Sequence, residues 1–255
     1  MTSDSSEVRD GVRLAVEGAV ARVVLDRPDK RNAQRPEMWR ALAEFGDSLP
    51  KTVRVVVVTG NGPSFSAGLD RSMFGQLGSD LDAGDDSFLD TIASYQAGFS
   101  WLRRPEFISV AAVQGHAVGA GFQLALACDL RIAATDAQFR MAEPSLGLVP
   151  DLGGTQVLVD LIGYSRALEI CATNRSVGGQ EADRIGLVNL CVSADELEGA
   201  VDDLVAALTS TVHDAVTMTK ALLLGARDRP YQQQLLAERQ AQLTRIRALA
   251  AGASQ

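Results

Sequence analysis

Residues 53–59, with the sequence VRVVVVT, constrain the fold more strongly than any other part of the chain. A strand with one solvated face alternates apolar and polar residues, whereas this run is β-branched at every position except Arg54. Such a run is typical of a parallel strand that is covered on both faces by helices. An amphipathic helix precedes it, with Pro36 in the first turn and an end near Leu49. The run therefore predicts an α/β fold.

The rest of the chain continues this alternation of strands and helices. Residues 12–16 and 20–25 predict a hairpin, because Glu17 and Gly18 form a turn signal between them. Further strands are expected at 108–113, 130–134 and 187–192, and helices at 88–102, 119–127, 194–209, 211–225 and 230–250. Residues 1–10 are expected to be frayed, and the glycine-rich, acidic stretch 75–87 to be a mobile loop. We predict a catalytic domain over residues 1–193 and a helical region over 194–255.

Charge and composition exclude several classes of partner. The chain carries 24 Lys and Arg against 32 Asp and Glu, which gives a net charge of −8 with no basic cluster for nucleic acid. It has no apolar stretch of about 18 residues and no basic-then-apolar leader, so we expect a cytoplasmic protein without a membrane partner. The acids near residue 80 lack calcium-loop spacing, and no metal site is predicted. Cys128, Cys171 and Cys191 are expected to be reduced.

Two glycine-bearing segments indicate the chemistry. Residues 65–70 (FSAGLD) and 119–123 (GAGFQ) each follow an apolar strand and leave backbone amides accessible, so two such amides can hold one oxyanion. Glu143 follows Gln123 by 20 residues and lies between apolar neighbours, where a carboxylate can carry protons. These features predict activation of an acyl group through an enolate.

Five segments, in order, resemble the enoyl-CoA hydratase/isomerase (crotonase) superfamily, and the likeness runs from about Val12 to the last helix. They are LDRPDKRNA at 25–33, FSAGLD at 65–70, VQGHAVGAG at 113–121, ACDLRIA at 127–133 and GLVPDLGGTQ at 147–156. The resemblance implies a crotonase-like ββα spiral with a C-terminal helical trimerisation layer, as a homotrimer or a dimer of trimers. It also implies acyl-CoA thioester substrates, with coenzyme A as part of the substrate and no separate cofactor.

The same resemblance assigns roles to individual residues. The oxyanion hole would use the backbone N–H groups of Ala67 and Ala120, and Glu143 would be the main acid/base. The residues expected around the acyl-CoA are Arg27, Lys30, Arg31, Ser66, Gly68, Leu69, Asp70, Gly119 and Gln123.

Two positions depart from the common hydratase pattern. Gln123 stands where hydratases carry a second glutamate, and an amide cannot act as a general base. Asp151 resembles an acid of dienoyl-CoA isomerases, although an N-cap for a helix starting near Leu152 is an equal alternative. We therefore expect double-bond isomerisation of an enoyl-CoA or dienoyl-CoA, with Glu143 and Asp151 as proton carriers. Hydration of a 2-enoyl-CoA and a non-catalytic acyl-CoA-binding role are the alternatives.

Overall fold

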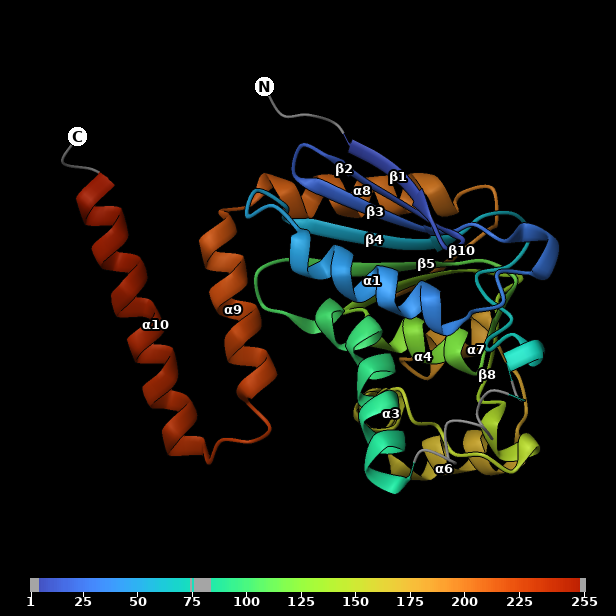
Figure 1. The fold of residues 1–255 in the computed structure, drawn as a ribbon. Helices are drawn as coiled ribbons and strands as arrows, with labels where there is room; N and C mark the ends of the chain where they lie inside the picture. The colour runs from blue at the N-terminus through green and yellow to red at the C-terminus, as the bar shows by residue number, and fades with distance from the viewer. Residues whose placement is uncertain (1–4, 74, 76–83, 253–255) are drawn as a thin grey trace.

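A seven-stranded sheet forms the centre of the protein (Figure 1). The structure is a computed structural model that describes residues 5–73, 75 and 84–252. Within these residues the strand order is β1-β2-β3-β4-β5-β7-β10, and the pairs from β3 onward are parallel. The strands are β1 (Ser5–Arg9), β2 (Val12–Glu17), β3 (Val20–Leu25), β4 (Val55–Gly60), β5 (Ile108–Val113), β7 (Leu130–Ala134) and β10 (Leu190–Val192).

Strand β4 is buried on both faces, as its sequence predicts. Val56 and Val58 belong to the main core beneath α1 (Pro36–Ser48), while Val55 and Val57 pack with α8 (Leu197–Ser210) on the opposite face. The residue alternation of a strand directs successive side chains to the two layers, so a continuous valine run serves two cores at once.

After β4, the chain alternates between the large sheet, a small sheet and helices. Strand β5 is followed by β6 (His116–Val118) and α4 (Ala120–Ala127), and β7 is followed by β8 (Gln138–Arg140). With β9 (Val177–Gly178), β6 and β8 form a three-stranded sheet. A single bridge between Ser66 and Ala117 joins the loop after β4 to this sheet. The arrangement is the expected ββα spiral.

The remaining helices surround these sheets. Helix α1 packs against α3 (Asp85–Ser100), and α4 contacts α5 (Gly154–Ile162). The other elements are α6 (Tyr164–Thr173), α7 (Gly179–Arg184) and the short 3-10 helices η1 (Pro28–Lys30), η2 (Arg71–Met73), η3 (Trp101–Arg103) and η4 (Glu143–Leu146).

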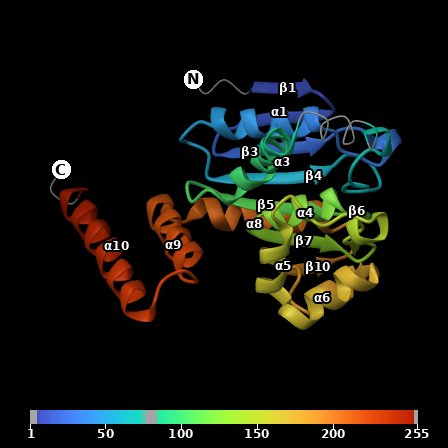
Figure 2. The same cartoon turned by 60° about the horizontal axis from the view of Figure 1, so that its bottom comes forward.

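The C-terminal helices divide into two parts. Helix α8 packs on the sheet, so it belongs to the body although it lies beyond residue 193. Helices α9 (His213–Gly225) and α10 (Tyr231–Gly252) lie side by side, and both views show α10 apart from the sheet (Figures 1 and 2). Lys220 anchors α9 to the body: its buried ammonium donates to Asp129 Oδ2 at 2.7 Å and to the carbonyls of Arg104 and Phe107.

Three sequence expectations need correction. Residues 5–9 are not frayed; they form β1, an antiparallel edge strand on β2 in which Glu7 pairs with Leu14. Edge strands tolerate polar residues, so the polar composition of this segment did not indicate a strand. Helix α3 begins at Asp85, and β10 covers only Leu190–Val192. Residues 76–83 of the expected mobile loop lie outside the described residues.

We predict that Lys220→Met lowers the free energy of unfolding by about 3 kcal/mol, because it leaves Asp129 charged and deprived of its counter-ion. Denaturant melts at constant slope would measure this loss. The double variant Lys220→Met with Asp129→Asn should recover part of it, and Lys51→Met, at an exposed position, is the matched control. Equal stability of Lys220→Met and the control would contradict the assignment.

Candidate active site

A cavity of about 630 Å³ opens between the loop after β4, the start of α4 and helix α3. Its lining combines backbone from the two glycine segments with two carboxylates and an apolar wall. The residues are Pro36, Trp39, Ala67, Gly68, Leu69, Arg71, Met73, Phe88, Leu89, Ile92, Tyr95, Val118, Gly119, Ala120, Arg140, Ala142, Glu143, Ser145, Leu146, Leu148, Val149, Asp151 and Leu152.

The two glycine segments meet at Gly68. This residue has φ +86°, and a Cβ placed there would lie 2.5 Å from the carbonyl oxygen of Val118 and 3.5 Å from the nitrogen of Ala120. A side chain would therefore separate the segments as well as strain the backbone. The absence of a side chain brings the 65–70 backbone against the first residue of α4.

The N–H groups that remain available are those of Leu69 and Ala120, which corrects the prediction for Ala67. The Ala67 N–H donates to the carbonyl of Arg31 at 2.8 Å. Gln34 pairs with Leu69 as a parallel bridge and uses the carbonyl of Gly68 and the N–H of Asp70. Because neighbouring peptides point in opposite directions along a strand, the Leu69 N–H faces away from Gln34.

Ala120 contributes its N–H for a different reason. It is the first residue of α4, and the first N–H groups of a helix have no partner within the helix. Neither Leu69 nor Ala120 donates its N–H to an acceptor within the described residues. Both residues line the cavity, so together they offer two donors for one ligand oxygen.

Glu143 lies beside the start of α4. Its side chain is held at Oε1 by the Gln123 amide, which donates at 2.8 Å, whereas Oε2 is buried and has no partner among the described residues. A Cβ at Gly119 would lie 3.2 Å from Oε1, so the carboxylate contacts this backbone closely. The residue is only 9% exposed. Burial raises the pKa of Glu143, and the nearby charge of Asp151 raises it further.

Asp151 lines the same cavity and is half-buried. Burial raises the pKa of its carboxyl as well. The alternative role as an N-cap is wrong, because α5 begins only at Gly154 and its cap residue, Gly153, makes no side-chain cap bond. Two carboxyls with raised pKa values therefore face one space.

Several residues predicted to hold the ligand brace the site from behind instead. Ser66 is buried, and its hydroxyl donates to the carbonyl of Asn32 and accepts from Gln34. Arg27 donates to Asp70 Oδ2 at 3.0 Å, and Asp70 also binds Ser72. These hydrogen bonds, chiefly those from Ser72, hold the pKa of Asp70 below its usual range, although burial acts in the opposite direction.

The remaining predicted positions divide in the same way. Gln123 is buried behind Glu143, and neither it nor Ser66, Arg27 or Asp70 lines the cavity. Lys30 and Arg31 are exposed on and beside η1, outside the lining. Ala67, Gly68, Leu69, Gly119, Ala120, Glu143 and Asp151 do line it.

From the sequence, only the loop from Met73 to Phe88 is expected to contribute to the wall of the pocket. Met73 and Phe88 do line the cavity, and residues 76–83 lie outside the described residues. The rest of the apolar wall was not predicted. Trp39 contacts Tyr95 with ring centroids 4.9 Å apart and donates its indole N–H to Gln34, so it presents hydrocarbon to the cavity. Trp39 is a buried core residue that also lines this cavity. Leu89 and Val149 also line the cavity and are 64% and 73% exposed. The apolar residues of the loop LGLV at 146–149 were the sequence feature that could have indicated this part of the wall.

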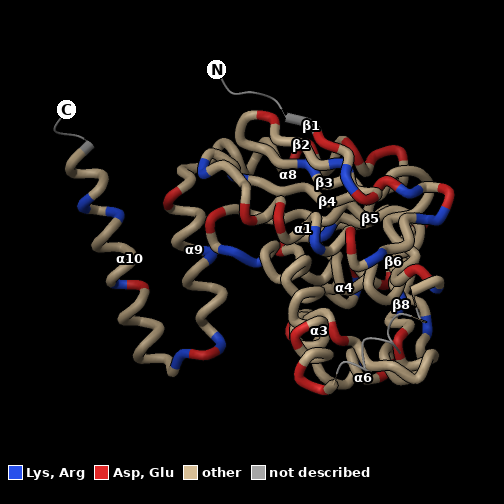
Figure 3. Tube along the Cα trace, in the orientation of Figure 1, with Lys and Arg blue, Asp and Glu red and all other residues tan. Residues whose placement is uncertain are grey.

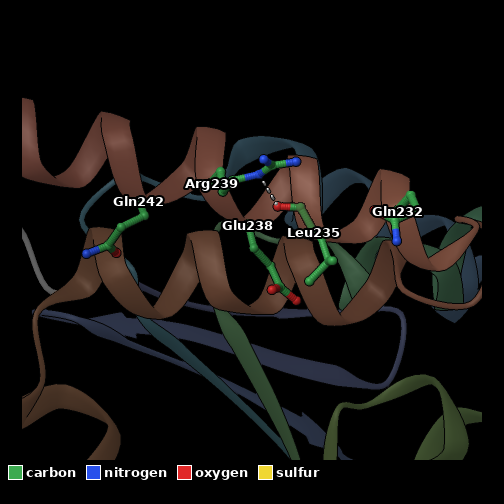
Figure 4. A pocket seen from close by; sticks show the side chains of 5 residues that line it. All are labelled: Gln232, Leu235, Glu238, Arg239 and Gln242. Carbon is green, nitrogen blue, oxygen red and sulfur yellow. Dashed lines mark hydrogen bonds between the residues drawn. The ribbon is translucent and has the colours of Figure 1, made fainter.

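Other surfaces offer less chemistry. A second depression lies on α10 and is lined only by residues of that helix, Gln232, Leu235, Glu238, Arg239 and Gln242 (Figure 4). Charges of both signs are interspersed along the described chain, without a continuous basic tract (Figure 3). Within residues 5–73, 75 and 84–252, no three His, Cys, Asp or Glu side chains cluster as a metal site. No helix there has the length and apolar content to cross a membrane.

Comparisons with known proteins agree with this fold and cavity. A family model for enoyl-CoA hydratase/isomerase matches residues 15–250. A peroxisomal Δ3,5-Δ2,4-dienoyl-CoA isomerase from Arabidopsis thaliana is 30% identical, over 92% of this chain and 88% of its own. A short-chain-enoyl-CoA hydratase from Clostridium acetobutylicum is 33% identical, over 83% and 80%.

A solved structure from Thermobifida fusca is more similar still. This protein, assigned to the enoyl-CoA hydratases and crystallised with CoA, is 48% identical over 94% of this chain and 95% of its own, with a TM-score of 0.89. The fold and cavity thus define a crotonase-type α/β spiral. The chain belongs to the enoyl-CoA hydratase/isomerase superfamily.

We predict that Glu143→Gln stabilises the protein at neutral pH. A carboxyl whose pKa is higher in the folded state binds more protons there than in the unfolded chain, so its ionisation lowers the unfolding free energy as pH rises. The gain in melting temperature should vanish toward about pH 4, where the carboxyl is protonated in both states, and should grow as the pH rises above the ordinary range of a glutamate. Glu106→Gln, at an exposed position, is the control. A gain that grows on acidification would contradict the pKa direction.

Proposed function

We propose that this protein moves a carbon–carbon double bond in an unsaturated acyl-CoA thioester through an enolate intermediate. The observation that carries the proposal is the buried, unpartnered Oε2 of Glu143, set beside the two available N–H groups of Leu69 and Ala120. A base and an oxyanion site next to each other are what deprotonation beside a thioester carbonyl requires.

The proposed reaction proceeds by two proton transfers. With a 3-enoyl thioester, the carbonyl oxygen binds between the N–H groups of Leu69 and Ala120. Glu143 Oε2 takes a proton from C2, and the C–H electron pair forms the enolate. A proton then returns to C4 while the double bond forms between C2 and C3, so the isomer leaves with its atoms unchanged and no water is consumed. One oxyanion donor is worth about 3 kcal/mol of barrier in comparable sites.

Asp151 extends this chemistry to longer conjugated substrates. In a 3,5-dienoyl thioester the returning proton goes to C6, farther from the carbonyl than Glu143. A second carboxyl in the same cavity, with a pKa raised by burial, is suited to hold and deliver that proton. The 30% identity to a dienoyl-CoA isomerase supports this role.

Hydration of a 2-enoyl-CoA is the second candidate, because several relatives are named as hydratases. The local geometry favours it less. The Gln123 carbonyl oxygen accepts from the N–H groups of Leu152 and Gly154, and its amide donates to Glu143. Gln123 thus has no acceptor left over to take a proton from water, and Glu143 would have to activate water alone. A non-catalytic acyl-CoA-binding role is the third candidate.

The CoA moiety is proposed to enter beside η1. Ala67 is tied to the Arg31 carbonyl, so the exposed cations Lys30 and Arg31 lie next to the oxyanion segment. Exposed cations at that place suit the phosphates of CoA. The CoA complex of the Thermobifida fusca relative supports this ligand.

Product analysis tests the reaction directly. The purified protein would be incubated separately with 2-enoyl, 3-enoyl and 3,5-dienoyl thioesters, and the products would be separated by chromatography. We expect the 2-enoyl or 2,4-dienoyl isomer to form. Accumulation of only the 3-hydroxyacyl product would reject isomerisation in favour of hydration.

Glu143→Gln should reduce deuterium exchange at C2 in heavy water by about 10²–10⁴-fold, because it removes the base. Asp151→Asn should retain this exchange but slow dienoyl isomerisation. Because the Asp151 charge raises the pKa of Glu143, its loss should move the acid limb of kcat/KM to lower pH. Exchange unaffected by Glu143→Gln would contradict the mechanism, and ligand-induced stabilisation without exchange would indicate a binding protein.

The C-terminal pair α9 and α10 is proposed to join copies of the chain into a trimer or a dimer of trimers. Helix α10 packs on α9 but not on the sheet, and it exposes Leu236, Leu243 and Ile246 at about half of their surface. Apolar area of this kind on a projecting helix is stabilised by burial against another chain.

Light scattering should therefore give the mass of three or six chains. The double variant Leu243→Glu with Ile246→Glu should shift the protein toward the monomer, because charge opposes burial of this face. Thr244→Glu is the matched control at a neighbouring exposed position. A monomeric mass for the unaltered protein would refute the assembly.

A further inference from the structure

We infer that Gln123 is a positioning residue whose single amide fixes both carboxyls of the site, Glu143 directly and Asp151 through the backbone that carries it. The inference deepens the proposed function and rests on it for the use made of the two carboxyls.

The hydrogen bonds of Gln123 fix the orientation of its amide. The residue is fully buried on α4. Its Oε1 accepts from Leu152 N at 2.9 Å and from Gly154 N at 3.4 Å, while its Nε2 donates to Glu143 Oε1 at 2.8 Å. Two N–H donors on one side require the amide oxygen there, which directs the NH₂ group to the carboxylate. One side chain therefore ties α4 to η4 and to the loop before α5.

The peptide between Asp151 and Leu152 is held at both ends. Its N–H binds Gln123, and its carbonyl accepts from Gln96 Nε2 of α3 at 2.7 Å. Bonds at the two opposite ends of one rigid peptide fix its plane. The Cα of Asp151 lies at one end of this peptide. Gln123 and Gln96 therefore fix the position of the backbone from which the Asp151 carboxyl extends.

The consequence for Glu143 is that its two oxygens are no longer equivalent. Oε1 is engaged by the amide, which leaves Oε2 as the oxygen that takes the proton in the proposed reaction. An amide does not ionise, so this bond persists at any pH at which the protein is folded. A glutamate at position 123 could accept from Leu152 and Gly154 but would bind Glu143 only when one of the pair is protonated.

Other groups around Glu143 do not provide the same hold. Asp151 faces it with like charge, and Arg140 lines the cavity from β8 while its Nε is bound to Asn174. Cys171 of α6 lies near enough that the Glu143 charge, after burial, raises the pKa of its thiol. Among the described residues, Gln123 alone makes a side-chain hydrogen bond to the Glu143 carboxylate.

The test replaces Gln123 by methionine, which has a similar length but neither bond. A hydrogen bond to a charged group is worth roughly a factor of 10 to 100, so we expect kcat to fall by about that factor with KM changed less than about threefold. The hydrogen bond lowers the pKa of Glu143, and its loss should move the titration of the Glu143 carboxyl, followed by ¹³C NMR, to higher pH. Gln156→Met, exposed on α5, is the matched control.

Two further variants keep the test decisive. Gln123→Glu retains the acceptor for Leu152 and Gly154, and it should convert the Glu143 titration into a coupled, two-step curve. Gln96→Ala removes only the exposed bond to Asp151, leaves the core intact, and should slow the dienoyl reaction by about two- to tenfold.

The outcomes separate this inference from the proposed function. Unchanged kcat and an unchanged Glu143 titration in Gln123→Met would overturn the positioning role while leaving the mechanism standing. Full C2 exchange in Glu143→Gln would overturn the mechanism. The NMR titration needs no turnover, so a shifted titration in Gln123→Met would support the contact between Gln123 and Glu143 even then.

Discussion

The site depends on the close approach of the 65–70 backbone to the start of α4. Gly68 permits it, since any side chain there would collide with the carbonyl of Val118. The bridge between Ser66 and Ala117 then holds the two segments in register. Both contacts are made by main chain alone. The positions of the two N–H donors therefore depend on the course of the backbone, and not on a side chain that a substitution could remove.

Around this backbone arrangement, polar side chains serve as supports more than as ligands. Ser66, Arg27 and Asp70 bind loops to one another, and Gln123 binds a carboxylate to a loop. The two carboxyls, by contrast, line the cavity with raised pKa values, and one oxygen of Glu143 has no hydrogen-bond partner among the described residues. This division is typical of catalytic sites, where reactive groups are left unsatisfied within a satisfied surrounding.

Sequence reasoning predicted what depends on local pattern. The continuous apolar run predicted the doubly covered strand β4, and the ordered motifs singled out Glu143 and the two glycine segments, which line one cavity. It chose the wrong N–H, Ala67 in place of Leu69, because that choice depends on which neighbouring peptides pair with Gln34 and Arg31. Strand β1 was missed for a similar reason: its partner β2, and not its own composition, makes it a strand.

The apolar wall of the cavity bears on how the substrate preference of such a protein can change. Leu89, Leu148 and Val149 line the cavity yet stay largely accessible to solvent, so little folding energy depends on them. Exchanging them alters the shape offered to a substrate tail without threatening the scaffold or the reactive groups beneath. Selection can therefore redirect such a catalyst toward new acyl groups through changes that cost little stability.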